Sequence, residues 1–333
     1  INRAILGKTN SYQNSKNKKI TLSDLFGLNV KVKAINNNWS FDSINDLSTL
    51  NIFKLDSGIR HSSTFKKYFR MPIIEESNFN IFTNYRSRAW NGTIGETEIK
   101  SAFGAFIEKD HHFTTGEVKN NLNIRIGVAK YKAEKLENSE IISLWRSSLF
   151  ASLHSEYLIW RSNPKSLILN NQSLLSPVFI NPELVFRTNI NSAYFQYLNS
   201  IDQGFVKLTL GPEIRLGTLN KNFLDYTKLS IMPGVKFKFG NSPFKFDNAI
   251  DMKTLNISLM QQIYGPLMFD VISNLNIDNN SENYGNYYDT KLGLLWNKRS
   301  YDCGIYYHPN NDAGGLYFRI NGFDFDNSVK EKF

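Results

Sequence analysis

The sequence predicts an all-β protein, an antiparallel transmembrane β-barrel of the outer-membrane type, either whole or partial. Alternating apolar and polar residues recur from one end of the 333-residue chain to the other, which is typical of strands with one apolar face. Aromatic residues make up 14% of the chain and gather near the ends of the alternating segments, as in the interfacial girdles of membrane barrels. No run of about 18 apolar residues occurs, which excludes a transmembrane helix.

The clearest alternating segment is TLNISLMQQIYGP (254–266), in which Leu255, Ile257 and Leu259 are separated by other, mostly polar residues. The same period of two occurs in five further stretches: GLNVKVKA from Gly27, NLNIRIGV from Asn121, FVKLTLG from Phe205, GVKFKFG from Gly234 and GLYFRIN from Gly315. Turn-forming clusters separate such segments, namely NNN at 36–38, GNSP at 240–243, DNNSENYGN at 278–286 and HPNNDAGG at 308–315. Counting the segments predicts roughly 14 to 18 strands.

One stretch is ambiguous. In IISLWRSSLFASL (141–153), Ile142, Trp145, Leu149 and Leu153 also fit the apolar stripe of a helix. We expect a strand, because the confident neighbouring segments are strands.

The chain reads as one continuous domain, since it has no Gly/Ser linker and no break in composition. We expect a polar N-terminal segment or the remains of a strand over 1–20, a β-barrel over 21–325 and a polar C-terminal tail over 326–333. The chain begins at Ile1 without a signal peptide or initiator Met, which indicates a mature or trimmed piece.

The alternation leaves open whether the apolar faces contact lipid or the core of a soluble β-domain. Basic side chains recur on the polar faces, which must then be wet, and in a barrel they would line the lumen. These candidates for a substrate path are Lys31, Lys33, Arg125, Lys207, Lys236, Lys238 and Arg319. A soluble sandwich also has a wet outer face, so the aromatic clusters and the long Asn-rich loops tilt the prediction toward a membrane barrel.

Charge and catalytic patterns narrow the function classes. The net charge is +9, but the basic residues are spread out and match no nucleic-acid motif, so we expect no nucleic-acid partner. Cys303 is the single cysteine, which allows no internal disulfide. We read His111-His112 as a loop pair, because ligands two residues apart would suit a metal better on a strand. No catalytic set stands out, and we expect no enzyme, no metal and no cofactor.

The last alternating segment carries a candidate assembly signal. Gly315 is followed by Phe318 and Ile320, a pattern that resembles the terminal-strand signal recognised by the barrel-assembly machinery.

A series of short words in one order gives a more specific indication: FLDYT (223–227), NSPFKFD (241–247), QQIYGP (261–266), NKRSYD (297–302), YYHP (306–309) and NGFDF (321–325), with RAWNGTIG (88–95) upstream. This series resembles the carboxy-terminal barrel of the cyanobacterial family related to LptD, the lipopolysaccharide-assembly protein of the outer membrane. The motif residues are Pro243, Asp247, Gln262, Tyr264, Gly265, Pro266, Arg299, Tyr301 and Pro309.

The resemblance implies an integral outer-membrane translocon that inserts lipopolysaccharide into the outer leaflet. In that family the sugar part passes through the lumen, and the acyl tails leave through a seam between the first and last strands. The expected partners are lipopolysaccharide, outer-membrane lipid, periplasmic lipopolysaccharide-bridge proteins and the barrel-assembly machinery. The sequence departs from the family in two respects, because the preceding jellyroll module is not recognisable and one cysteine cannot support disulfide-controlled maturation. The alternative function is a passive porin-like channel for small solutes, which should narrow its lumen with an in-folded loop.

Overall fold

The computed structural model describes residues 4–8, 28–47, 59–69, 77–138, 140–162, 181–198, 200–219, 221–298 and 301–320. The described part is all-β apart from two short 3-10 turns, η3 (Gly92–Ile94) and η4 (Pro309–Asn311). Its strands are β1 (Ala4–Lys8), β2 (Leu28–Asn36), β3 (Trp39–Leu47), β4 (Ile59–Phe69), β5 (Ser77–Asn91), β6 (Gly95–Thr115), β7 (Val118–Glu134), β8 (Ile141–Arg161), β9 (Glu183–Tyr197), β10 (Asp202–Leu216), β11 (Thr227–Gly240), β12 (Lys253–Tyr264), β13 (Leu267–Asn276), β14 (Tyr287–Asn297), β15 (Tyr301–His308) and β16 (Ala313–Ile320).

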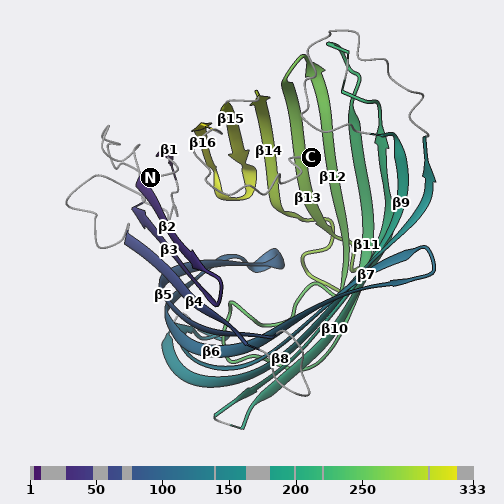
Figure 1. The fold of residues 1–333 in the computed structure, drawn as a ribbon. Coiled ribbons are helices and arrows are strands. Elements are labelled where there is room, and N and C mark those ends of the chain that lie inside the picture. Colours follow the sequence, from purple (N-terminus) through teal and green to yellow (C-terminus); the bar gives the residue numbers. More distant parts are fainter. Residues whose placement is uncertain are drawn as a thin grey trace.

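These strands form one 16-stranded antiparallel sheet in which each strand from β2 to β16 pairs with its neighbour along the chain. The sheet curves strongly around an interior (Figure 1). β1 pairs with β16, from Ala4 opposite Phe318 to Lys8 opposite Gly314. Some Cα atoms of β1 and β2 lie within 8 Å, but no hydrogen-bonded register joins these two strands in the described part, so the sheet is not closed.

Exposure alternates along the strands in a sense opposite to that of a water-soluble sheet. In β7, Ile124, Ile126 and Val128 are exposed, with Ile126 at 59%, whereas Arg125 is half-buried and Ala129 is 5% exposed. The described residues include more buried polar and charged side chains than buried apolar ones. Exposed apolar side chains therefore cover the convex face, and the concave face carries buried polar side chains together with a packed aromatic cluster.

The convex apolar face is continuous from strand to strand because the register aligns it. Ile107 of β6 is opposite Ile126 of β7, which is opposite Leu149 of β8 and then Tyr194 of β9. The other half of the sheet has a similar apolar row. It runs from Phe269 of β13 through Leu294 of β14 and Ile305 of β15 to Leu316 of β16. Directly opposed residues project to the same face, so these rows form an apolar belt across many strands.

The main packed core lies on the concave face and not between two layers. It contains Ala129, Tyr131 and Phe195 together with Phe244, which comes from the connection between β11 and β12. A connecting segment thus supplies the partner for the inner face of the sheet, a role that a second sheet has in a sandwich.

The sequence predictions for this part are mostly confirmed. The ambiguous stretch 141–153 is strand, within β8, and the number of described strands falls within the predicted range. The loop expected at His111-His112 is wrong, because the β6–β7 hairpin stays paired up to Thr115 opposite Val118, which makes both histidines strand residues. No helix of the described residues has the length and apolar character needed to cross a membrane.

Candidate functional site

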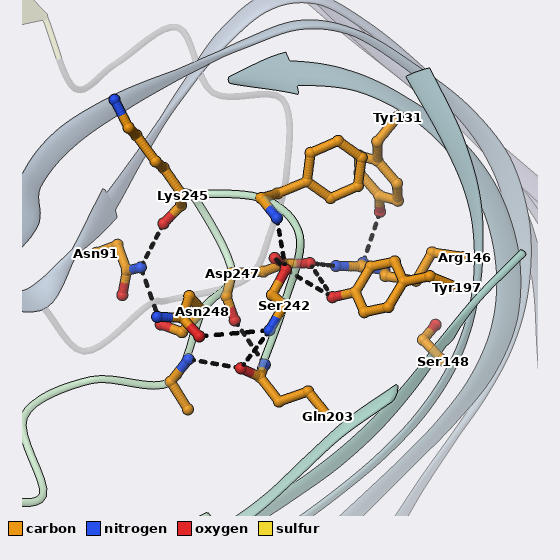
Figure 2. A network of polar contacts seen from close by, with 12 residues as sticks. Asn91, Tyr131, Arg146, Ser148, Tyr197, Gln203, Ser242, Lys245, Asp247 and Asn248 are labelled. Carbon is orange, nitrogen blue, oxygen red and sulfur yellow. Dashed lines mark hydrogen bonds and ion pairs between the residues drawn. The ribbon is translucent and has the colours of Figure 1, made fainter. Parts of the chain in front are cut away.

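The connection between β11 and β12, residues 241–252, folds into the interior of the sheet, and we name it the inner segment. Figure 2 shows it within the curve of the surrounding strands. Phe244 is fully buried, and Ser242, Asn248, Ala249 and Asp251 are each less than 9% exposed. The sequence GNSP predicts a turn at this point, but nothing local indicates that the turn and the residues after it pack inward.

A buried ion pair holds the inner segment to the sheet. Asp247 Oδ2 accepts a hydrogen bond of 2.5 Å from Arg146 Nη1 of β8, and both side chains are 8% exposed. The same carboxylate accepts a 2.9 Å bond from the Tyr197 hydroxyl and another from the Ser242 hydroxyl. A buried charge is tolerated only when it is paired and hydrogen-bonded, and here both conditions are met.

The Arg146 guanidinium is also enclosed by aromatic rings. It lies 4.2 Å from the ring centroid of Tyr131 and 4.5 Å from that of Phe195, and its Nη2 donates a 2.8 Å bond to the Tyr131 hydroxyl. Cation–π contacts of this kind stabilise a desolvated cation by about 2 kcal/mol or more. The inner segment adds a third ring, because the guanidinium also lies 5.7 Å from the ring centroid of Phe246.

Gln203 of β10 clamps the backbone of the inner segment. Its side chain is fully buried. The Nε2 group donates to the Asp247 carbonyl at 2.9 Å, while Oε1 accepts from the backbone N–H groups of Ala249 at 2.9 Å and Ser242 at 3.1 Å. A single amide thus bonds three backbone groups of the inner segment, of which the Ser242 N–H also donates to Asn248 Oδ1 at 3.4 Å.

The hairpin word RAWNGTIG provides a second attachment. Asn91 Nδ2 donates to the carbonyls of Lys245 at 2.6 Å and Asn248 at 3.0 Å. Thr93 donates from its backbone N–H and its hydroxyl to the Asp251 carboxylate, at 2.8 and 2.7 Å. Two words that lie about 150 residues apart in the sequence therefore form one contact surface in the structure.

The residues at the end of β7 form a third attachment for the inner segment. Phe244 forms an isolated antiparallel bridge with Lys135, just beyond β7. The Lys245 N–H donates to the Glu134 carbonyl at 3.0 Å, and the Lys245 ammonium lies 3.2 Å from the Glu134 carboxylate. This second ion pair is much more exposed than the one at Asp247 and is correspondingly screened by solvent.

A different cluster joins FLDYT and QQIYGP at the other end of the strands. Gln262 is fully buried; it accepts from the Asp225 N–H at 2.8 Å and donates to the carbonyls of Lys221 at 2.9 Å and Gly265 at 2.8 Å. Burial in this cluster raises the pKa of Tyr226 to about 12. The motif NKRSYD also contacts this cluster, because the Asn297 N–H donates to the Pro266 carbonyl at 2.9 Å.

A network of alternating charges crosses β8, β9, β10 and β11 near this cluster. Glu213 is 2% exposed and forms ion pairs with Arg187, Arg215 and Lys228. Glu183 connects Arg215 at 2.7 Å to Arg161 at 2.8 Å. Carboxylates within the sheet therefore engage each of these cations, and Arg161 at the edge of the network is still 49% exposed.

Six of the seven basic candidates share the concave face. One row of directly opposed residues runs from β7 to β11: Arg125, Phe150, Ala193, Phe205 and Lys238. Lys207 is opposite Lys236 on the same face. A second row of opposed residues leads from β2 to the buried ion pair: Lys33, Asp42, Thr64, Phe82, Gly104, Ala129 and Arg146. Lys31 lies two residues before Lys33 on the same strand and therefore projects to the same face. The side chain of Arg319 lies outside the described part, although its backbone is opposite Asp302.

Two of these candidates are occupied by the inner segment. Lys236 donates to the Ile250 carbonyl, and Lys238 donates to the Asn241 side chain at 3.2 Å. Their transport role stays a prediction, as does that of the other candidates.

The remaining candidates are distributed over several turns and strands. Pro243 and Asp247 belong to the inner segment, whereas Gln262, Tyr264, Gly265 and Pro266 form the end of β12 and its turn. Tyr301 begins β15 and Pro309 begins η4, while Arg299 lies outside the described residues. Of the proposed assembly signal, Gly315, Phe318 and Ile320 all lie in β16, where Phe318 is 52% exposed.

Sequence reasoning missed Arg146, Tyr197 and Gln203, the strand residues that hold the inner segment. Strand alternation puts Arg146 on the same face as Ser148 and Phe150, and this signal could have added it to the basic candidates. Its pairing with Asp247 spans 101 residues, which no local pattern reveals.

The comparisons with known proteins place the whole site within one family. A family model matches residues 1–324, and its description is "Protein of unknown function (DUF3769)". The chain belongs to this family. No curated protein matches the chain.

Proposed function

We propose that this protein of the DUF3769 family is an outer-membrane β-barrel that inserts lipopolysaccharide into the outer leaflet. The observation that carries the membrane part is the reversed distribution of side chains, with a continuous apolar belt on the convex face and buried polar groups inside. Monomeric soluble proteins rarely expose contiguous apolar patches larger than a few hundred Å². In a bilayer the same belt would contact acyl chains. The proposal also requires the β1–β2 edge to close there, because a membrane-spanning sheet must satisfy every backbone group.

The sequence words support the lipopolysaccharide part of the proposal. Those that resemble the LptD-related barrel form contacts with one another in the fold, RAWNGTIG with NSPFKFD through Asn91 and FLDYT with QQIYGP through Gln262. The first of these contacts joins residues 154 positions apart and does not follow from the pairing of neighbouring strands, whereas the second joins the ends of the paired strands β11 and β12. The proposal extends to the partners implied by the resemblance, namely periplasmic lipopolysaccharide-bridge proteins and the barrel-assembly machinery.

Within this proposal the inner segment acts as an internal constriction. Its ion pair with Arg146 and its clamp by Gln203 hold it across the concave face. A translocon needs its interior closed until substrate arrives. Basic side chains on the same face would attract phosphate and carboxylate groups of the substrate through a field that low-dielectric walls strengthen.

The inner segment also favours the second candidate, a passive porin-like channel. A porin narrows its lumen with an in-folded loop, and residues 241–252 have that form. The two functions differ in what passes, since a porin conducts small solutes steadily and a translocon moves an amphiphile to the cell surface.

The experiment that separates the two functions is depletion of the protein in its own cells, followed by labelling of newly exposed surface lipopolysaccharide. A translocon predicts a fall in surface lipopolysaccharide and accumulation of intermediates inside the cell. Unchanged surface lipopolysaccharide with altered uptake of small solutes would reject the translocon and leave the porin. A carbonate wash of the membranes tests the shared premise, because an integral barrel stays in the membrane and a peripheral β-protein is released.

A further inference from the structure

A cavity of about 250 Å³ opens on the concave face beside the inner segment. Strands β4 to β8 line it, and its wall combines three kinds of side chain. Aromatic rings come from Phe82, Phe106 and Phe150, and hydroxyl or amide groups come from Ser62, Thr64, Asn84 and Ser148. The cations of the wall are Arg125 and Arg146.

Arg125 is held in this wall by two aromatic rings. Its guanidinium carbon lies 4.4 Å from the ring centroid of Phe150 and 5.1 Å from that of Phe106. Contacts with ring faces orient a guanidinium but leave its N–H groups, which lie in its own plane, available for hydrogen bonds. The two rings therefore fix the plane of the donor fork without consuming its donors.

The two arginines of the cavity differ in their ion pairing. Arg146 is paired with Asp247, whereas no carboxylate of the described residues lies within 4.0 Å of the Arg125 guanidinium. Glu108 stands directly opposite Arg125 in the register, yet its carboxylate accepts from Asn123 at 3.0 Å and lies 4.0 Å from Lys66. The nearest acidic partner across the ladder is thus engaged elsewhere.

We propose that Arg125 and this cavity form a binding site for an oxyanion, such as the phosphate or carboxylate group of a polar ligand. A guanidinium presents two parallel N–H donors that match the oxygens of such a group. The cavity has room for a small headgroup beside the cation, and its hydroxyl and amide groups supply further hydrogen bonds. The site deepens the transport proposal, on which it rests in part because Arg125 is one of its substrate-path candidates, but anion binding is measured apart from transport and can fail independently of it.

The test is isothermal titration calorimetry of the full chain, purified in an uncharged detergent, with two probes. Inorganic phosphate reports a small free anion, and a lipid with a phosphate headgroup, added in mixed micelles, reports a headgroup. We expect saturable binding of at least one probe and at least a tenfold loss of affinity in Arg125→Gln. Arg125→Lys keeps the charge but loses the flat fork, so an intermediate loss is expected.

Two controls separate the site from the general charge of the interior. Lys228→Gln removes a cation that lies on the same face, outside the cavity lining and outside the set of substrate-path candidates, and we expect less than a twofold change. Circular dichroism and the gel mobility of unheated samples check that every variant is folded. Binding of the lipid but not of free phosphate assigns the site to a headgroup, whereas binding of free phosphate alone assigns it to small anions. The proposal is wrong if neither probe binds, or if folded Arg125→Gln binds as the unaltered chain does.

Discussion

Removal of the Asp247 charge should release the inner segment while leaving the sheet intact. Asp247→Asn keeps the shape of the side chain and one acceptor oxygen, so it isolates the effect of the charge. Arg146 would remain 8% exposed with three ring contacts but no carboxylate. Breaking a buried ion pair on one side costs about 3–5 kcal/mol, and we expect about 3 kcal/mol because one hydrogen bond to the amide oxygen survives.

Hydrogen exchange measured by mass spectrometry on peptides from 241–252 checks this value. A loss of about 3 kcal/mol in the free energy of local opening corresponds to roughly 150-fold faster exchange, at about 1.36 kcal/mol for each factor of ten. The amide of Ala249, which donates to Gln203, should show the change, whereas amides in the middle of β8 should not.

Lys245→Gln is the matched control, because it removes the other ion pair of the same segment. That pair is 25% and 35% exposed, and pairs with such exposure contribute about 1 kcal/mol or less. Exchange should therefore rise less than about fivefold. The combined change of Arg146→Met with Asp247→Leu should restore much of the protection, since it leaves no unpaired buried charge. Equal effects of Asp247→Asn and Lys245→Gln would refute the assignment of the buried pair as the main anchor.

Three further predictions concern the rest of the fold. Ile126→Lys places a charge on the apolar belt and should destabilise the bilayer-inserted state by about 2–4 kcal/mol, measured by urea unfolding in lipid vesicles, whereas Thr64→Lys on the concave face should cost far less. Gln262→Ala should speed hydrogen exchange over 221–226, because about 1–3 kcal/mol is lost for each backbone group left without its partner; unchanged exchange would show that the cluster does not depend on this amide. Gly217→Ala should lower the urea midpoint, because Gly217 has φ +83° and an added Cβ would collide with the Asp225 carbonyl, and a midpoint equal to that of the unaltered chain would contradict the local geometry.

The strands and their faces could be predicted from the sequence to a large extent. Alternation is a local property, since successive side chains on a strand point to opposite faces whatever the strand pairs with. For that reason the lysines at 31, 33, 207, 236 and 238 could be assigned to one kind of face before any strand was paired. The loop expected at His111-His112 was wrong because the length of a hairpin depends on its partner strand, and β7 continues the pairing up to Val118.

The candidate site could be predicted only in part. Asp247 was singled out by its motif, but Arg146 was not, because the charge of a strand residue gives no indication of its partner across the interior. Arg125 was named as one basic residue among seven, and nothing in its neighbourhood distinguished it. Its separate character comes from Phe106 and Phe150 on the adjacent strands and from the engagement of Glu108 by Asn123 and Lys66.

The sequence by itself determined that the chain is a series of strands with one apolar and one polar face. This was possible because the alternation of apolar and polar side chains is a property of residues that are neighbours in the sequence. Only the tertiary structure decided that the apolar face is convex and exposed, that residues 241–252 turn inward, and that Arg146 is paired with Asp247 while no carboxylate of the described residues lies within 4.0 Å of Arg125. These features depend on contacts between residues as far as 158 positions apart, and such contacts exist only once the register of the whole sheet is fixed.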